Sequence, residues 1–197
     1  MRLKHVSTFA MLLAAAAAPA FAEDKASPIS ITADEPKLKK PVEDLDYRYW
    51  EVVLRIKNQS NNEIVLSPFV YVKVQNSARR EVRPDAFIGA GFAGHELMDE
   101  IEKRFIVVPA GKTGEIAVNL ANNDMGNYMN GWHFKTPGDY MIQLRCKFNR
   151  KEFADTFFKA PFAVEDKELQ NLKRADRKWN QALEIDKTLS VVLKIGR

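Results

Sequence analysis

The sequence predicts a mainly β fold in which short strands pack as a β-sandwich. Apolar and polar residues alternate over residues 49–57, and this period of two is typical of a strand with one face in a core and the other in water. Similar stretches recur at regular spacing and are separated by Gly, Pro and Asn. Short strands between turns favour a sandwich over a βαβ fold.

The N-terminus has the layout of a cleavable signal peptide. The basic residues Arg2 and Lys4 precede an apolar stretch too short to span a bilayer, and the small residues Ala20 and Ala22 stand before the expected cut. We therefore expect residues 1–22 to be removed on export and the protein to work in the periplasm of a Gram-negative bacterium. An uncleaved membrane anchor is the alternative, and it requires a longer apolar run.

Composition argues against a nucleic-acid partner and against a disulfide framework. The chain has 30 Lys and Arg against 26 Asp and Glu, a formal net charge of +4, which loses Arg2 and Lys4 on cleavage and is too small to indicate nucleic acid. Cys146 is the single cysteine, so no intrachain disulfide forms. Its place in an alternating stretch predicts a buried thiol that fills the core like a small apolar side chain.

Four segments follow from these patterns. Residues 1–22 are expected to be the signal peptide, 23–46 an N-terminal edge strand and linker, 47–165 the β-sandwich, and 166–197 a C-terminal helical extension.

Local patterns also predict the order of strands. Residues 29–31 are expected to form an edge strand. Pro68 interrupts the apolar run at 63–75, which predicts two short strands or one strand that changes sheets at a bend. Residues 105–108 and 116–120, separated by a Pro- and Gly-containing turn, predict a hairpin. Further strands are expected from Tyr140 to Phe148 and around 153–164.

Two helices are expected. Residues 95–104 predict a short inserted helix. Beyond Asp166, a candidate helix cap, apolar residues recur at helical spacing: Leu169, Leu172, Trp179 and Leu183. This predicts a C-terminal amphipathic helix that packs on the sandwich, with a partner-docking or anionic-surface helix as the alternative. Residues 189–195 either extend this helix or add a strand, and periodicity does not decide between them.

Three pieces of sequence resemble the recurring parts of bacterial immunoglobulin-like modules. They are the stretch at 50–66, the Pro109-Ala110-Gly111-Lys112 turn, and Pro137-Gly138-Asp139-Tyr140. Over about residues 50–150 their order is similar to that of the BsuPI-type proteinase inhibitor domain. The resemblance implies an immunoglobulin-like β-sandwich with a tyrosine corner at Tyr140, whose hydroxyl would bond the backbone a few residues upstream. Antibody-type domains place a cysteine where this chain has Ile142, and no known inhibitory-loop motif matches.

Motifs for enzymes and cofactors fail their requirements. Residues 89–94 have the glycine spacing of a dinucleotide site but follow Arg83-Pro84-Asp85 instead of a core strand. His95-Glu96-Leu97-Met98-Asp99 lacks the second His of a zinc peptidase. We therefore expect a non-enzymatic protein with no catalytic residue and no cofactor.

Soft metal ligands leave one alternative open. Met125, Met129 and His133 are of the kind that binds Cu(I) in the periplasm, and their spacing permits such a site without specifying one. A copper-binding periplasmic protein is therefore one alternative function.

The main expectation is a binding or accessory protein that recognises a protein partner in the cell envelope through loops at one end of the sandwich. Arg and aromatic residues on loops are where binding energy concentrates. The expected partner-binding residues are Arg79, Arg80, Arg83, Phe92, Tyr128 and Trp132. An inhibitor or immunity protein that acts against an envelope enzyme or toxin is a further alternative.

Overall fold

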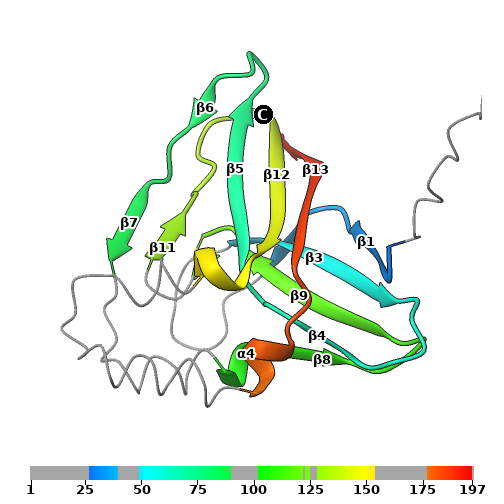
Figure 1. Ribbon diagram of the computed structural model, residues 1–197. Helices are drawn as coiled ribbons and strands as arrows, with labels where there is room; N and C mark the ends of the chain where they lie inside the picture. Colours follow the sequence, from blue (N-terminus) through cyan, green and yellow to red (C-terminus); the bar gives the residue numbers. More distant parts are fainter. Residues whose placement is uncertain are drawn as a thin grey trace, which may run out of the picture.

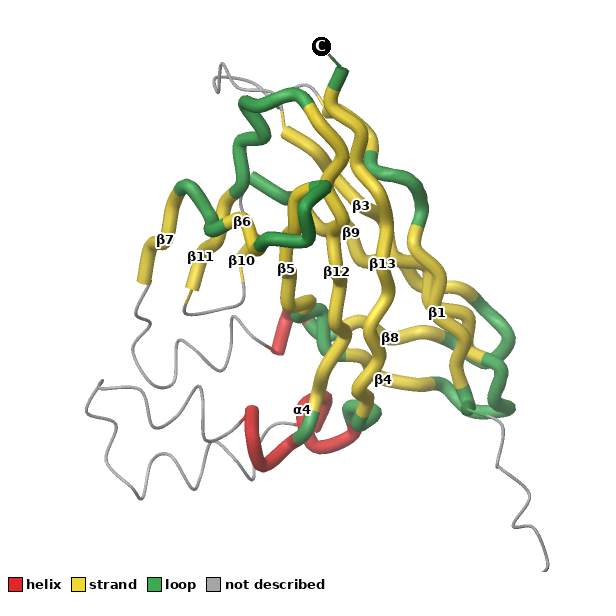
Figure 2. The backbone as a smooth tube through the Cα atoms, turned by 90° about the horizontal axis from the view of Figure 1, so that it is seen from above, coloured by secondary structure: helices red, strands yellow, loops and turns green. Residues whose placement is uncertain are grey.

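The computed structural model describes residues 27–39, 49–89, 102–121, 123–124, 128–153 and 177–196, and it is mainly β with several sheets (Figures 1 and 2). The expected signal peptide, the start of the inserted helix, most of the last expected strand pair and the segment from Asp166 to Leu172 lie outside these residues. Within the described part, no helix is long and apolar enough to cross a bilayer.

One sheet is built around β3 (Tyr49–Asn58), as its alternating pattern predicts. Every second residue toward its end, from Val52 to Asn58, is buried. On one side β3 pairs with β9 (Thr113–Asn119), and on the other with β1 (Ile29–Ala33) and β2 (Lys37–Lys39), all antiparallel. The expected edge strand near the N-terminus is thus confirmed.

A bulge separates β1 from β2 on this edge. Ala33 lies opposite Leu54 and Lys37 opposite Glu51, so the three residues 34–36 face two residues of β3. The extra residue and Pro36 interrupt the edge, which is how many sheets prevent further strands from pairing.

A second sheet has the order β13-β12-β5-β6, and its centre is β12 (Gly138–Phe148). On one side β12 pairs with β5 (Val70–Asn76), which is followed by the short β6 (Glu81–Val82). On the other it pairs with β13 (Ile185–Ile195) along all eleven residues. Figure 1 shows this sheet from β6 on the left to β13 on the right.

The smaller sheets settle two predictions. β4 (Ile64–Leu66) pairs with β8 (Ile106–Val108), while β5 belongs to the sheet of β12, so the chain does change sheets at Pro68. The expected hairpin at 105–120 is wrong, because β8 pairs with β4 and β9 pairs with β3. The turn at Gly111, whose φ is 69°, therefore joins two sheets rather than two paired strands. The second small sheet has the order β10-β11-β7, formed by Asn123–Asp124, Tyr128–Gly131 and Ala86–Gly89.

The C-terminal extension is not helical to its end. Within the described residues, the helix α4 covers Arg177–Gln181 and buries Trp179. Arg150 holds the chain where this helix stops, because its guanidinium donates to the carbonyls of Asn180 (3.0 Å) and Ala182 (2.9 Å). The chain then enters β13, so the open choice for residues 189–195 resolves as a strand, set by the eleven pairing positions that β12 offers.

A hydrophobic core joins the two larger sheets. Most of its buried residues come from β1, β3 and β9 on one side and from β5, β12 and β13 on the other, and β4 and β8 contribute Leu66 and Val108. Cys146 is buried within it, as predicted. The Tyr140 hydroxyl donates to the carbonyl of Thr136 at 2.8 Å, the backbone bond expected for a tyrosine at this position.

Candidate binding surface at the β5–β6 hairpin

The turn between β5 and β6 has a backbone fixed by hydrogen bonds. The Arg79 N–H donates to the Asn76 carbonyl (2.8 Å), and the Asn76 N–H donates to the Arg80 carbonyl (2.9 Å). The Asn76 side chain adds two bonds, because its Oδ1 accepts from the N–H groups of Ala78 (3.1 Å) and Arg80 (3.0 Å). This hairpin tip is therefore a preorganised loop.

Arg79 occupies a backbone conformation that few side chains adopt. Its φ is 59°, the left-handed region in which Gly or Asn normally closes a three-residue hairpin loop. The Cβ of an ordinary residue costs about 1–2 kcal/mol there. Strain of this kind is an observation from which a functional hypothesis can start.

Three arginines of this hairpin and its continuation are exposed: Arg79, Arg80 and Arg83. Within the described part of the chain, none of the three forms an ion pair. Glu81, the acidic residue between them, is already bonded to Lys73 at 2.8 Å. Each guanidinium thus keeps its five N–H donors for water or for a partner.

Trp132 does not belong to this exposed surface, which corrects the expectation for it. Its side chain is only 5% exposed and lies in the core. The indole N–H donates to the Val82 carbonyl (2.9 Å), and the Trp132 backbone N–H donates to the Leu120 carbonyl (2.8 Å). Trp132 therefore ties β6, and with it the arginine hairpin, to the core.

The other expected binding residues are only partly described. Tyr128 lies in β11 opposite Gly89 of β7, so the backbone places it next to the strand that continues from the hairpin. Its side chain and all of Phe92 lie outside the described residues.

The possible copper ligands are not brought together by what the structure describes. Met125 and the side chain of Met129 lie outside the described residues, and the backbone N–H of His133 donates to Asp85 Oδ2 at 2.7 Å. Among the described residues, no group of three His, Cys, Asp or Glu side chains is arranged to hold a metal ion.

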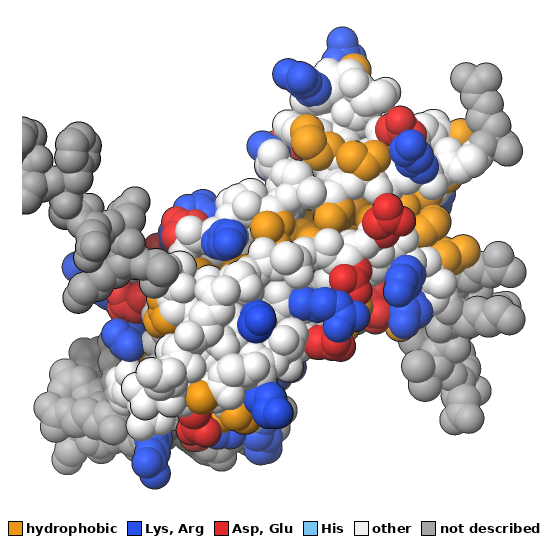
Figure 3. Space-filling view, turned by 90° about the vertical axis from the view of Figure 1, so that its right-hand side faces the viewer, with side chains coloured by type: hydrophobic (Ala, Val, Ile, Leu, Met, Phe, Trp, Pro, Cys, Tyr) orange, Lys and Arg blue, Asp and Glu red, His pale blue; other side chains and the backbone are white. Residues whose placement is uncertain are grey.

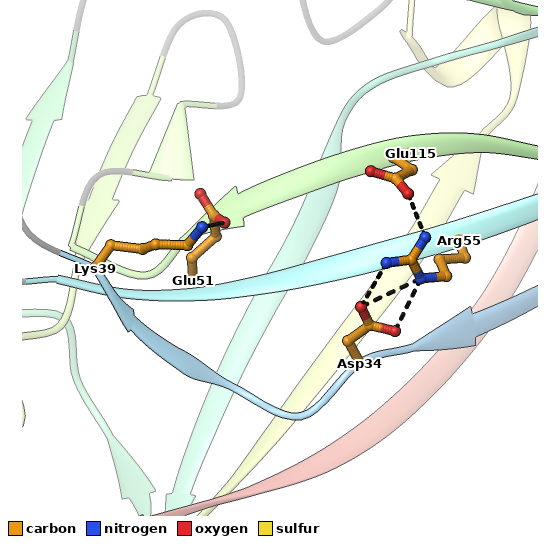
Figure 4. Close-up of polar contacts among 5 residues, drawn as sticks. All are labelled: Asp34, Lys39, Glu51, Arg55 and Glu115. Atoms are coloured by element: carbon orange, nitrogen blue, oxygen red, sulfur yellow. Dashed lines mark hydrogen bonds and ion pairs between the residues drawn. The ribbon is translucent and has the colours of Figure 1, made fainter. Parts of the chain in front are cut away.

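An exposed ion-pair cluster joins β3, β9 and the bulge after β1 in the sheet built around β3 (Figure 4). The Arg55 guanidinium on β3 contacts both carboxylate oxygens of Asp34 (3.0–3.2 Å) and also bonds to Glu115 on β9. The hydrogen bond from Arg55 lowers the pKa of Asp34 below its usual value. Beside it, Lys39 on β2 pairs with Glu51 on β3 at 3.2 Å. Sequence reasoning missed this cluster, and its geometry is that of a structural tie across neighbouring strands.

The buried thiol of Cys146 is unsuited to act as a nucleophile. Burial raises its thiol pKa to about 11, so the thiolate is scarce at neutral pH.

Comparison with known proteins gives no family for this chain. No protein-family profile matches the sequence, and no curated protein matches it.

Proposed function

We propose that this chain is a non-enzymatic periplasmic binding or accessory protein that recognises an acidic surface of a protein partner through the β5–β6 end of the fold. The observation that carries the proposal is the fixed hairpin with three exposed arginines, none of which has a carboxylate partner in the described part of the chain. The proposed architecture is an immunoglobulin-like β-sandwich. Two sheets that share one core and the Tyr140–Thr136 bond support it.

Preorganisation is the physical reason to expect binding here. A loop that is already ordered loses little conformational entropy when a partner docks. Arginine is enriched among residues that dominate interfaces, since its planar guanidinium forms paired hydrogen bonds with carboxylates. The buried Trp132 beneath β6 holds the hairpin in place through its hydrogen bond to the Val82 carbonyl, so the hairpin keeps its position when a partner binds.

Charge complementarity makes the proposal testable through salt and charge reversal. A partner with acidic residues should associate faster at low ionic strength and lose that advantage as salt rises. The double variant Arg80→Glu/Arg83→Glu reverses two charges and leaves Arg79 and the turn geometry in place. The control Lys57→Glu/Lys112→Glu makes the same change in net charge at two exposed positions outside the hairpin.

The experiment is comparative affinity purification from periplasm with the three proteins immobilised. We expect one protein to be retained by the wild type and by the control and to be lost with the hairpin variant. Purified, that protein should bind the hairpin variant about 30- to 1,000-fold more weakly, since each of the two interface arginines contributes on the order of 1–2 kcal/mol. Equal retention by both variants, or no specifically retained protein, would contradict the proposal.

A further inference from the structure

The edge strand β13 has an unpaired side. One side of β13 pairs with β12 over all eleven residues. Strand β1 lies close to β13, but within the described chain no backbone hydrogen bond reaches the side of β13 away from β12. Its length is about twice that of an average strand. Its pairing has no bulge, and no Pro interrupts it.

Two other sheet edges of the described chain are interrupted, and its remaining edge strands are shorter than β13. The edge formed by β1 and β2 is broken by the bulge at 34–36 with Pro36, and the edge strand β6 has only two residues and is soon followed by Pro84. Proteins usually avoid long uninterrupted edges because such edges recruit further strands. Among the described strands β13 is the longest uninterrupted edge, because β9, the other open edge of the sheet around β3, covers only Thr113–Asn119.

The sequence of β13 is complementary to itself when read in the opposite direction. We propose that β13 pairs antiparallel with β13 of a second copy of this chain about a two-fold axis at Ser190. The outer face of the strand carries Asp186, Thr188, Ser190, Val192 and Lys194, all exposed. In this register Asp186, whose carboxylate also accepts two hydrogen bonds from Arg145 of its own chain (2.6 and 2.7 Å), lies opposite Lys194 of the second copy. Thr188 lies opposite Val192 of the second copy.

Neighbouring registers lose this match. Centring the pair on Leu189 places Asp186 opposite Val192, and centring it on Val191 places Lys194 opposite Thr188. Only the register centred on Ser190 sets all eleven residues against eleven and joins opposite charges on the outer face. Val192, which is 53% exposed in the single chain, gains a neighbour in this arrangement.

A cavity beside this edge is placed to receive Lys187 of the second copy, the one charged residue on the inward-facing side of β13. Lys187 falls on the inward-facing side of β13 yet is exposed, and no ion pair to it is described. In the proposed register it lies opposite Leu193 of the second copy. There a cavity of about 560 Å³ runs along Val191 to Lys194 and is also lined by Glu35 and Trp50.

The cavity has the chemistry to hold an ammonium group. Glu35 supplies a carboxylate and Trp50 an aromatic ring, both of which attract a lysine ammonium. Figure 3, which faces this side of the molecule, shows a band of exposed hydrophobic side chains bordered by acidic and basic ones. Such a surface is suited to a second strand that brings both apolar residues and charges.

Cysteine cross-linking tests the register directly. Cys146 is buried, so a single introduced thiol dominates the reaction. Under mild oxidation Ser190→Cys should give a covalent dimer, because opposed Cα atoms in an antiparallel pair are about 4.5–5.5 Å apart. Thr188→Cys alone should not, since its two copies would be separated by four residues, about 13 Å along the strand. A mixture of Thr188→Cys and Val192→Cys should again form a dimer.

A charge swap provides an independent readout by sedimentation. Lys187→Glu and Glu35→Lys should each shift the protein toward the monomer, and the double variant should restore the wild-type association, with circular dichroism confirming that all three fold. A wild-type protein that is monomeric at every concentration, self-linking by Thr188→Cys, or a double variant no better than the single ones would overturn the proposal. None of these variants touches the arginine hairpin, so the outcome is separate from that of the proposed function.

Discussion

Asn58 offers a sharp test of how the sheets are fastened together. Its side chain is fully buried and uses all of its hydrogen-bonding capacity. Nδ2 donates to the carbonyls of Asn62 (2.7 Å) and Val108 (2.9 Å), and Oδ1 accepts from the N–H (2.9 Å) and the hydroxyl (2.7 Å) of Ser60. One amide therefore joins the end of β3, the following turn and the end of β8.

Replacing Asn58 by Ala removes four hydrogen bonds at once. At a net value of about 1 kcal/mol each, less what water regains in the partly exposed turn, the free energy of unfolding should fall by about 3 kcal/mol. Asn58→Asp should lose at least as much at neutral pH, because a carboxylate oxygen would then face two carbonyl oxygens.

Urea unfolding followed by tryptophan fluorescence and circular dichroism measures the loss. The matched control is Asn62→Ala, an exposed Asn whose side chain has no described hydrogen bond, and it should cost less than about 0.5 kcal/mol. The reasoning fails if Asn58→Ala loses under about 1 kcal/mol or no more than the control.

Three further outcomes follow from local geometry and charge. Gly131→Ala should destabilise the fold strongly, because the added Cβ would lie 2.2 Å from the carbonyl oxygen of Ala121. Thermal unfolding measures the loss, and a melting temperature equal to that of the wild type would contradict this prediction. Cys146 should resist alkylation at pH 8 and react fully in urea, since burial raises its pKa to about 11; rapid native labelling, read by mass spectrometry, would be the opposite result. The hydrogen bond from Arg145 lowers the pKa of Asp186. This pair therefore stabilises the fold above the unfolded carboxyl pKa near 3.8, and its contribution disappears as the pH falls through the lower folded pKa. Asp186→Asn should weaken the fall in unfolding free energy at acidic pH, and an unchanged pH dependence would refute the assignment.

Patterns that depend on near neighbours were readable from the sequence. The alternation in β3 specified which face is buried, because the period of a strand is independent of its partner. Pro68 marked the change of sheets, since proline lacks the N–H that a continuous ladder needs. The Tyr140 hydroxyl bond spans four residues and was within reach of a motif.

Features that depend on distant partners were not readable. The strands on either side of Gly111 have the sequence pattern of a hairpin. However, β8 pairs with β4 and β9 pairs with β3, strands that lie about 40 to 60 residues earlier in the chain. Trp132 follows a loop and was expected at the surface, but Val82 and Leu120 supply the hydrogen-bond partners that bury it. The same limit hid the Arg55 cluster, whose two carboxylates are 21 and 60 residues from the arginine.

The C-terminal strand unites the two proposed surfaces. Because β6 and β13 are opposite edges of one sheet, adding β13 of a second copy would leave both arginine hairpins free. The continuous sheet would run from one β6 to the other across eight strands, which at about 4.8 Å per step separates the hairpins by on the order of 30 Å. Two rigid, identical basic sites at a fixed spacing bind a repeating or dimeric acidic partner far more tightly than one site does, without any new contact. The unblocked edge of β13 would then raise the affinity of the arginine hairpins at the opposite edge of the same sheet.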